Sequence, residues 1–221
     1  MTHISTDATG DSRSDQLAAL GNATDRLALE FGASFGRETI ERLVISSYDH
    51  LAGPATVAVF LPLLAERFAR ERLHALAKVE GHNPDGRPTI LFLCTHNAGR
   101  SQMARGFLRH PAGEAVVGLS GGSEPGDQVN PAALAVMAER GIDISDAYPK
   151  PWTDETVRAA DVVITMGCGD ACPVFPGKRY EEWALEDPAG MSADDVRPVR
   201  DEIERRVLGL LAELGVVAAT A

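Results

Sequence analysis

A cysteine and an arginine with five residues between them frame a short polar loop at residues 94–101. The loop follows an apolar run at 89–93 and precedes a predicted helix that opens at Ser101. Backbone N–H groups in such a loop converge on one point, and the helix N-terminus adds partial positive charge there. The pattern therefore predicts a site for a tetrahedral oxyanion. The residues expected to bind it are Thr95, His96, Asn97, Ala98, Gly99, Arg100 and Ser101.

Cys94 is the candidate nucleophile of this loop. The loop dipoles and the nearby guanidinium favour the thiolate, which is the reactive form of cysteine. Arg100 offers a planar fork that can hold two oxygens of a phosphate-like group, which a lysine does less well. Ser101 is expected to hydrogen-bond the sulfur, and Asn97 to hold the loop in shape. The alternative is a buried structural cysteine at a strand end.

Two further cysteines, Cys168 and Cys172, follow a second apolar strand. Three cysteines in 221 residues are too few for a disulfide framework, so a catalytic or metal role is favoured. Their spacing indicates a redox relay with Cys94. Zinc held by the cysteines and His96 is disfavoured, because the spacing matches no common zinc finger and a metal would block the nucleophile. No metal site is predicted, and two inert loop thiols are the other alternative.

Residues 88–215 resemble the low-molecular-weight tyrosine phosphatase fold and, within it, the thiol-dependent arsenate reductases. The shared motif is Cys94-x5-Arg100-Ser101, which matches the phosphate-binding loop of that fold. The residue that follows is Gln102, as in the reductase branch, whereas phosphatases of the family usually have proline there. The resemblance implies that arsenate is the substrate, with phosphate or sulfate as mimics, and that no cofactor is needed.

The resemblance also implies a general acid at an Asp-Pro pair late in the chain, and Asp187 falls in the matching interval. On the residues alone, Asp-Pro is more often an ordinary turn signal. Phosphatases commonly continue with aromatic residues that shape a tyrosine pocket, whereas Ala189 and Gly190 stand here. A phosphotyrosine substrate is correspondingly disfavoured.

The mechanism that the resemblance implies has three thiol steps. Cys94 attacks the arsenic of bound arsenate while Asp187 helps a hydroxide to leave. Cys168 then attacks Cys94, which releases arsenite and leaves a disulfide between these two residues. Cys172 next attacks Cys168 and moves the disulfide outward, where thioredoxin is expected to reduce it.

Other functions stay open on the sequence alone. An arsenate reductase coupled to glutathione, or to mycothiol and mycoredoxin, would need only Cys94, and the short spacing between the outer cysteines leaves room for that alternative. A low-molecular-weight protein tyrosine phosphatase would need only Cys94, Arg100 and Asp187. A non-catalytic oxyanion sensor, with a helical head that binds a partner, is the alternative from another class.

The elements that must position the site alternate along residues 89–221. Apolar runs predict strands at 89–93, 115–119 and 161–166, and helices at 101–110, 131–140, 153–160 and 193–214. This order predicts an α/β domain with a parallel four-stranded sheet, helices on both faces and the site at the carboxyl ends of the strands. A further strand is expected near 144–147.

Residues 16–80 predict a separate three-helix bundle, because apolar residues such as Ile40 and Leu43 recur at helical spacing. Three helices of this size form a marginal core, so a homodimer through this unit is expected. The unit also resembles the three-helix extension of some arsenate reductases, which is associated with dimerisation. A DNA-binding head is disfavoured, because no basic recognition helix stands out.

Composition agrees with a cytoplasmic protein that binds neither nucleic acid nor membrane. The net charge of −11 opposes binding to polyanions. No apolar run approaches the roughly 20 residues that span a bilayer. Residues 1–15 are polar, unlike a signal peptide, and are predicted to be a disordered tail. Residues 81–88 are rich in turn formers and predict a linker.

Overall fold

The computed structural model describes most of the chain, namely residues 8–53, 60–82, 86–167 and 174–216. Two compact units divide the chain, Met1–Ala77 and Lys78–Ala221, and each packs around its own buried apolar residues. The predicted relay residues Cys168 and Cys172 lie outside the described residues. Among the helices that are described, none is long and apolar enough to cross a membrane.

The first unit is built from three helices, as the sequence predicts. They are α1 Ala8–Phe31, α2 Arg37–Leu51 and α3 Leu61–Val79. Leu27, Ile40 and Leu73 are fully buried in their shared core. The prediction of a disordered tail over residues 1–15 is wrong from Ala8 onward, because α1 begins there. Extending an existing helix costs far less than nucleating one, so α1 continues into the polar segment.

The second unit contains a four-stranded sheet in which all neighbouring strands are parallel, which confirms the predicted fold class. The strands, in their order across the sheet, are β2 Val117–Gly122, β1 Thr89–Cys94, β3 Val162–Met166 and β4 Arg179–Glu182. The inner strand β1 is buried along its whole length. Cys94 pairs with Gly122 on one side and with Met166 on the other. The carboxyl ends of β2, β1 and β3 therefore lie side by side at the same end of the sheet.

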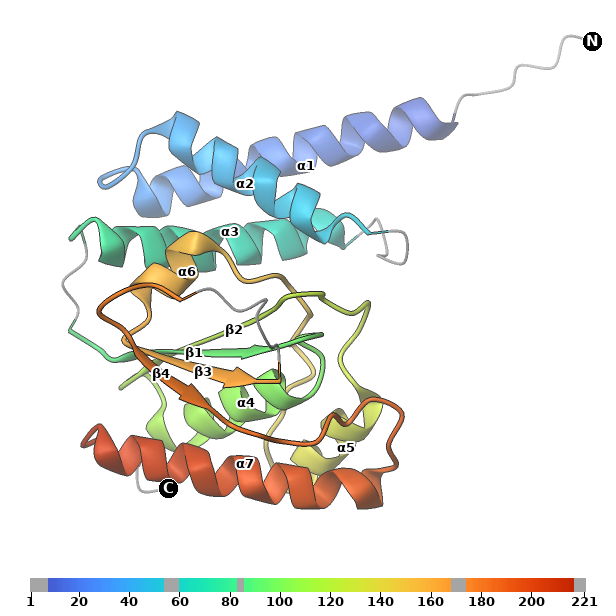
Figure 1. The fold of residues 1–221 in the computed structure, drawn as a ribbon. Coiled ribbons are helices and arrows are strands. Elements are labelled where there is room, and N and C mark those ends of the chain that lie inside the picture. Colours follow the sequence, from blue (N-terminus) through green and yellow to red (C-terminus); the bar gives the residue numbers. More distant parts are fainter. Residues whose placement is uncertain (1–7, 54–59, 83–85, 168–173, 217–221) are drawn as a thin grey trace, which may run out of the picture. The chain divides into compact units, whose positions relative to one another are not determined.

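Helices cover both faces of this sheet, as predicted (Figure 1). On one side lie α4 Arg100–Ala112, α5 Pro131–Ala138 and α7 Ala193–Glu213, and on the other lies the short α6 Asp154–Ala159. Alternate residues of β1 enter the two cores, because successive side chains of a strand point to opposite faces. Ile90 and Phe92 pack on the side of α4 and α7, whereas Leu91 and Leu93 pack on the side of α6.

Two features of the sheet differ from the prediction. The segment 144–147 contains a turn and is not a strand. The fourth strand is instead β4, whose residues are half-buried or exposed. An edge strand needs no continuous apolar run, so its sequence carries little strand signal. The strand expected at 115–119 begins later, at Val117, and ends at Gly122. A glycine at position 121 lets the Trp152 backbone come close, since a β-carbon there would lie 2.9 Å from it.

Candidate active site

The loop that follows β1 carries the candidate nucleophile. Cys94 is the last residue of β1, and only 2% of its surface is exposed. The chain turns through residues 95–99 and enters α4 at Arg100. The N-terminus of α4 is therefore joined directly to the loop, as the anion-site prediction requires. Residues 94–101 are called the oxyanion loop below.

The sulfur of Cys94 contacts the hydroxyl of Ser101 at 3.1 Å, as expected from the sequence. Asn97 Nδ2 donates to the same hydroxyl oxygen over 2.8 Å. Because that oxygen already accepts one hydrogen, its own proton is free to point at the sulfur. The Ser101 hydroxyl is therefore placed to donate a hydrogen bond to the sulfur of Cys94.

Asn97 holds the shape of the oxyanion loop, as the sequence predicts. Its φ of 48° lies in the left-handed region, which asparagine tolerates better than most residues. Its side chain is fully buried, and Oδ1 accepts hydrogen bonds from the Lys150 amide and from Gln102 Nε2, each 3.0 Å away. The loop is thus anchored from inside the domain and is preorganised before an anion arrives.

Arg100 is buried beside this loop, with 5% of its side chain exposed. One terminal nitrogen donates to Asp187 Oδ2 over 2.6 Å, and the other donates to the Leu185 carbonyl over 3.3 Å. The buried Nε has no hydrogen-bond partner among the described residues. The guanidinium is therefore held through its two terminal nitrogens, while its Nε donor is left without an acceptor in the described part of the chain.

Asp187 and Pro188 lie against the oxyanion loop although they are distant from it in sequence. Asp187 Oδ1 accepts a hydrogen bond of 3.1 Å from the Ala189 amide, so this Asp-Pro pair does form a turn. The same turn presses on Gly99, where a β-carbon would lie 2.5 Å from Pro188 Cγ. The carboxylate is thereby set beside the guanidinium of Arg100. Residues 187–190 are called the Asp-Pro turn below.

A small pocket opens where these groups meet. The residues that line it are Cys94, His96, Ala98, Gly99, Arg100, Asn130, Asp187, Pro188 and Ala189. Sequence reasoning missed Asn130, whose only local signal was an Asn-Pro helix start. Thr95, Asn97 and Ser101 support the pocket and do not line it. The chemistry that the arrangement permits is nucleophilic attack by sulfur on the centre of a bound oxyanion, next to a carboxyl group.

The segment that leads to Cys168 contacts two residues of the oxyanion loop. Thr95 Oγ1 donates to the Gly167 carbonyl over 3.0 Å. Gly167 has a φ of +76°, and a β-carbon there would stand 2.9 Å from a terminal nitrogen of Arg100. The residue before Cys168 is therefore placed against both the oxyanion loop and the guanidinium. Cys168 and Cys172 themselves lie outside the described residues.

Two family models match this chain. The low molecular weight phosphotyrosine protein phosphatase model matches residues 89–218, and the protein-tyrosine-phosphatase-like N-terminal domain model matches residues 20–77. The chain belongs to the low molecular weight phosphatase family. Within this family the chain is similar to several arsenate reductases, which confirms the resemblance found in the sequence.

Three of these relatives illustrate how similar they are to this chain. A thioredoxin-dependent arsenate reductase of Corynebacterium glutamicum, known as a solved structure, is 45% identical, with a TM-score of 0.80 over 89% of this chain and 96% of that one. A putative arsenate reductase of Halobacterium salinarum is 37% identical over 55% of this chain and 89% of its own length. A glutaredoxin arsenate reductase of Synechocystis is 38% identical over 57% of this chain and 97% of its own length.

Gln102 shows how this member of the phosphatase family supports its oxyanion loop. Its Nε2 donates to the backbone carbonyl and to Oδ1 of Asn97, over 2.9 and 3.0 Å, and to the Tyr148 carbonyl over 3.1 Å. Proline at this position, usual in the family's phosphatases, has no side-chain donor and could make none of these bonds. Gln102 therefore acts on the shape of the loop from behind and lies outside the pocket lining.

The described residues offer no cluster of three or more histidine, cysteine or acidic side chains that could hold a metal ion. His96 lines the pocket and places its Nδ1 3.1 Å from the Glu124 carbonyl, a contact that fixes the ring through the backbone.

Proposed function

We propose that this family member reduces arsenate to arsenite with the thiol of Cys94. The observation that carries the proposal is the pocket in which Cys94 faces a buried guanidinium with one donor unused, beside a carboxylate. A tetrahedral oxyanion matches that set of groups in charge, size and hydrogen-bonding capacity. The similarity to arsenate reductases along nearly the whole of their length supports arsenate over other anions.

In the first chemical step, the Cys94 thiolate attacks the arsenic atom and a sulfur–arsenic bond forms. Asp187 in its protonated form gives its proton to the departing hydroxide, which leaves as water. Backbone N–H groups of residues 95–101 and the guanidinium of Arg100 stabilise the remaining oxygens. This step changes the ligands of arsenic but not its oxidation state.

Reduction takes place in the next step, for which we assign Cys168. Its thiolate attacks the sulfur of Cys94, a disulfide forms, and the electron pair of the broken sulfur–arsenic bond stays on arsenic, which leaves as arsenite. The contacts of Gly167 with Thr95 and Arg100 support this assignment, because they bring the residue that precedes Cys168 to the oxyanion loop. Cys172 then attacks Cys168, which frees Cys94 and leaves an outer disulfide.

The reductant that opens this outer disulfide is proposed to be thioredoxin. The C. glutamicum relative is thioredoxin-dependent, and it resembles this chain over most of its length. Mycothiol with mycoredoxin, or glutathione, is the competing reductant. A protein that uses a small thiol would need Cys94 alone, so the two couplings predict different results for variants of the outer cysteines.

Arsenate-dependent NADPH oxidation, coupled through thioredoxin and its reductase, tests this function. The wild-type protein should turn over many times, and Cys94→Ser should be inactive. Cys168→Ala should form no arsenite in a single turnover, whereas Cys172→Ala should form one equivalent and then stop. Repeated turnover by Cys172→Ala with thioredoxin would contradict the relay. Turnover of the double Cys168→Ala, Cys172→Ala variant with mycothiol would identify small-thiol coupling.

We also propose that the first unit pairs two copies of the chain. Five large apolar side chains of this unit are at least 46% exposed. They are Leu17, Leu29, Ile45, Phe60 and Leu63. Leu29 is 91% exposed, so Leu29→Glu cannot disturb the core of its own unit but would oppose an apolar contact between copies. Sedimentation of the full chain should show a dimer that this variant weakens, and a monomer at every concentration would refute the pairing.

A further inference from the structure

Asn130 connects the two sides of the pocket. Its backbone N–H donates to the Ala98 carbonyl of the oxyanion loop over 2.9 Å. Its side-chain Nδ2 donates to the Pro188 carbonyl of the Asp-Pro turn, also over 2.9 Å. One residue therefore bonds to the loop that carries Cys94 and to the turn that carries Asp187.

The other end of the Asn130 side chain begins α5. Oδ1 accepts hydrogen bonds from the amides of Ala132 and Ala133, at 2.8 and 3.1 Å, so Asn130 is the N-cap of this helix. With the oxygen committed to the helix, the amide nitrogen has one orientation, toward Pro188. The Asn130 side chain therefore links the N-terminus of α5 to the Asp-Pro turn.

Pro188 is held from two directions. Its ring packs on Gly99, where a β-carbon would stand 2.5 Å from Cγ, and its carbonyl accepts from Asn130. The same carbonyl also accepts from the Met191 amide over 3.1 Å within the turn. Loss of the Asn130 donor would thus leave the carbonyl bonded, and would remove only the link between the turn and α5.

We propose that Asn130 is a positioning residue that holds the Asp-Pro turn over the oxyanion loop, so that Asp187 faces the anion bound beside Cys94. The inference rests on the proposed role of Asp187 as the acid in arsenate reduction. Asn130 itself transfers no proton in this reaction. Rates of proton transfer depend steeply on geometry, so release of the turn should slow the chemical step more than it weakens anion binding.

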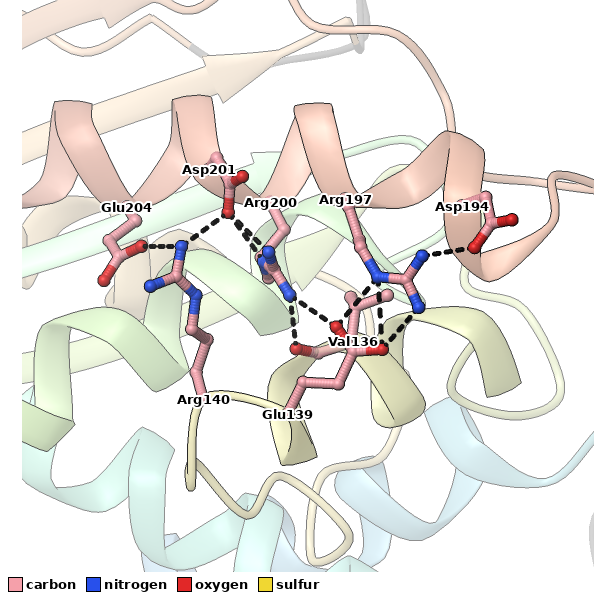
Figure 2. A network of polar contacts seen from close by, with 8 residues as sticks. All are labelled: Val136, Glu139, Arg140, Asp194, Arg197, Arg200, Asp201 and Glu204. Carbon is pink, nitrogen blue, oxygen red and sulfur yellow. Dashed lines mark hydrogen bonds and ion pairs between the residues drawn. The ribbon is translucent and has the colours of Figure 1, made fainter.

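The far end of α5 offers a matched control. Arg197 and Arg200 of α7 bind Glu139, the C-cap of α5, through hydrogen bonds of 2.7 to 3.2 Å, and Arg200 also donates to the Val136 carbonyl over 3.0 Å (Figure 2). Hydrogen bonds from Arg197, and then from Arg200, lower the pKa of Glu139 to about 2. Glu139→Gln therefore weakens the anchorage of α5 at neutral pH without touching the Asp-Pro turn.

The test compares Asn130→Ser with Glu139→Gln. Serine is a good N-cap but is too short to reach Pro188, so α5 should stay formed. Asn130→Asp, which also caps well and lacks the donor, provides a second variant should the serine protein be unstable. Single-turnover arsenite formation should slow about 10- to 100-fold in the Asn130 variants and less than about twofold in Glu139→Gln. Binding of inorganic phosphate by Asn130→Ser should stay within about threefold of wild type.

A second readout does not need activity. The Ala189 amide donates to Asp187 Oδ1, so its ¹H–¹⁵N signal reports on the Asp-Pro turn. The signal should move in Asn130→Ser and stay in place in Glu139→Gln. An unmoved Ala189 signal, or equal rate losses in the two variants, would overturn the inference. Failure of the wild-type protein to form arsenite would instead overturn the proposed function, and the Ala189 comparison would still decide the role of Asn130.

Discussion

Arg100 Nη2 and Asp187 Oδ2 form a 2.6 Å ion pair between residues that are 87 positions apart in the sequence. Arg100 is buried, whereas 42% of the Asp187 side chain is exposed. The carboxylate thus occupies part of the guanidinium fork that an oxyanion would use. An oxyanion that accepts from this terminal nitrogen as well as from the unpaired Nε would displace the carboxylate, so Asp187 must release Arg100 before it can act as an acid.

Asp187→Asn should separate these two effects. The substitution removes the acid, so single-turnover arsenite formation should fall by roughly 10²- to 10³-fold. It also removes the negative charge that competes for Arg100, so phosphate should bind about two- to fivefold more tightly by calorimetry. Glu186→Gln, one residue away, provides a control and should leave both quantities within about twofold of wild type. A parallel loss of binding and rate would show that Asp187 supports the pocket and is not its acid.

Gly99→Ala should push the Asp-Pro turn away from the loop. The new β-carbon would lie 2.5 Å from Pro188 Cγ, a distance at which one of the two must move. Overpacking of this kind costs about 1–3 kcal/mol of unfolding free energy, and the displaced acid should lower turnover as well. Gly126→Ala is the control, because its β-carbon would meet its neighbours at 3.8 Å or more. Equal thermal stability and activity of the two variants would contradict the packing described for Pro188.

Sequence alone predicted the part of the site whose signals are local. Cys94, the loop and α4 follow one another in the chain, and an apolar strand that runs into a polar loop and a helix is a strong local pattern. Asp187 was placed at the site only by resemblance, because the turn signal of Asp-Pro carries no information about a partner 87 residues away. Asn130 was missed for the same reason, since its bond to Pro188 spans 58 residues.

The fold shows the same division between local and distant information. The apolar runs that became β1 and β3 were found because both faces of these strands are largely buried. The edge strand β4 was missed, since an edge position leaves Arg179 and Glu182 exposed. The apolar residues near 144–147 led to a false strand: Ile144 is buried in the core, but from a turn. Burial in the core explains why a position is apolar, but it does not determine whether the backbone there forms a strand or a turn.

Asn97→Ala should damage both stability and the site. Alanine would occupy a φ of 48° at a cost, and the hydrogen bonds to Ser101, Gln102 and Lys150 would be lost. The expected loss of unfolding free energy is roughly 2–4 kcal/mol, measured by urea denaturation. Asn97→Gly loses the same bonds without the backbone cost and should be about 1 kcal/mol more stable than the alanine variant. If alanine were the more stable of the two, the left-handed conformation would not be strained.

Glu66 should stabilise the first unit in a pH-dependent way. This buried carboxylate of α3 accepts hydrogen bonds from Arg26 and Arg70, and the bond from Arg26 is the main cause that lowers its pKa below the usual 4.5. A lowered pKa in the folded state means that the stabilisation is present above about pH 4.5 and is lost as the pH falls through the folded value. Glu66→Gln should therefore cost about 1–2 kcal/mol at pH 7.

Urea denaturation from pH 7 down to pH 3 measures this dependence. The difference in stability between the wild-type protein and Glu66→Gln should shrink as the solution becomes more acidic. Glu41→Gln, at an exposed position of α2, should change the unfolding free energy by less than about 0.5 kcal/mol. A Glu66 difference that stays constant over this range would mean that packing of the side chain, and not its charge, supplies the stability.

The burial of β1 has a consequence for the chemical reactivity of the protein. Cys94 sits at the end of a strand whose residues are all buried, and among the described residues its sulfur is reached from water through the pocket. We therefore expect a bulky electrophile to reach this sulfur more slowly than a compact oxyanion that fits the pocket. A thiol placed in this way is shielded from large oxidants and alkylating agents while it stays open to a small anion.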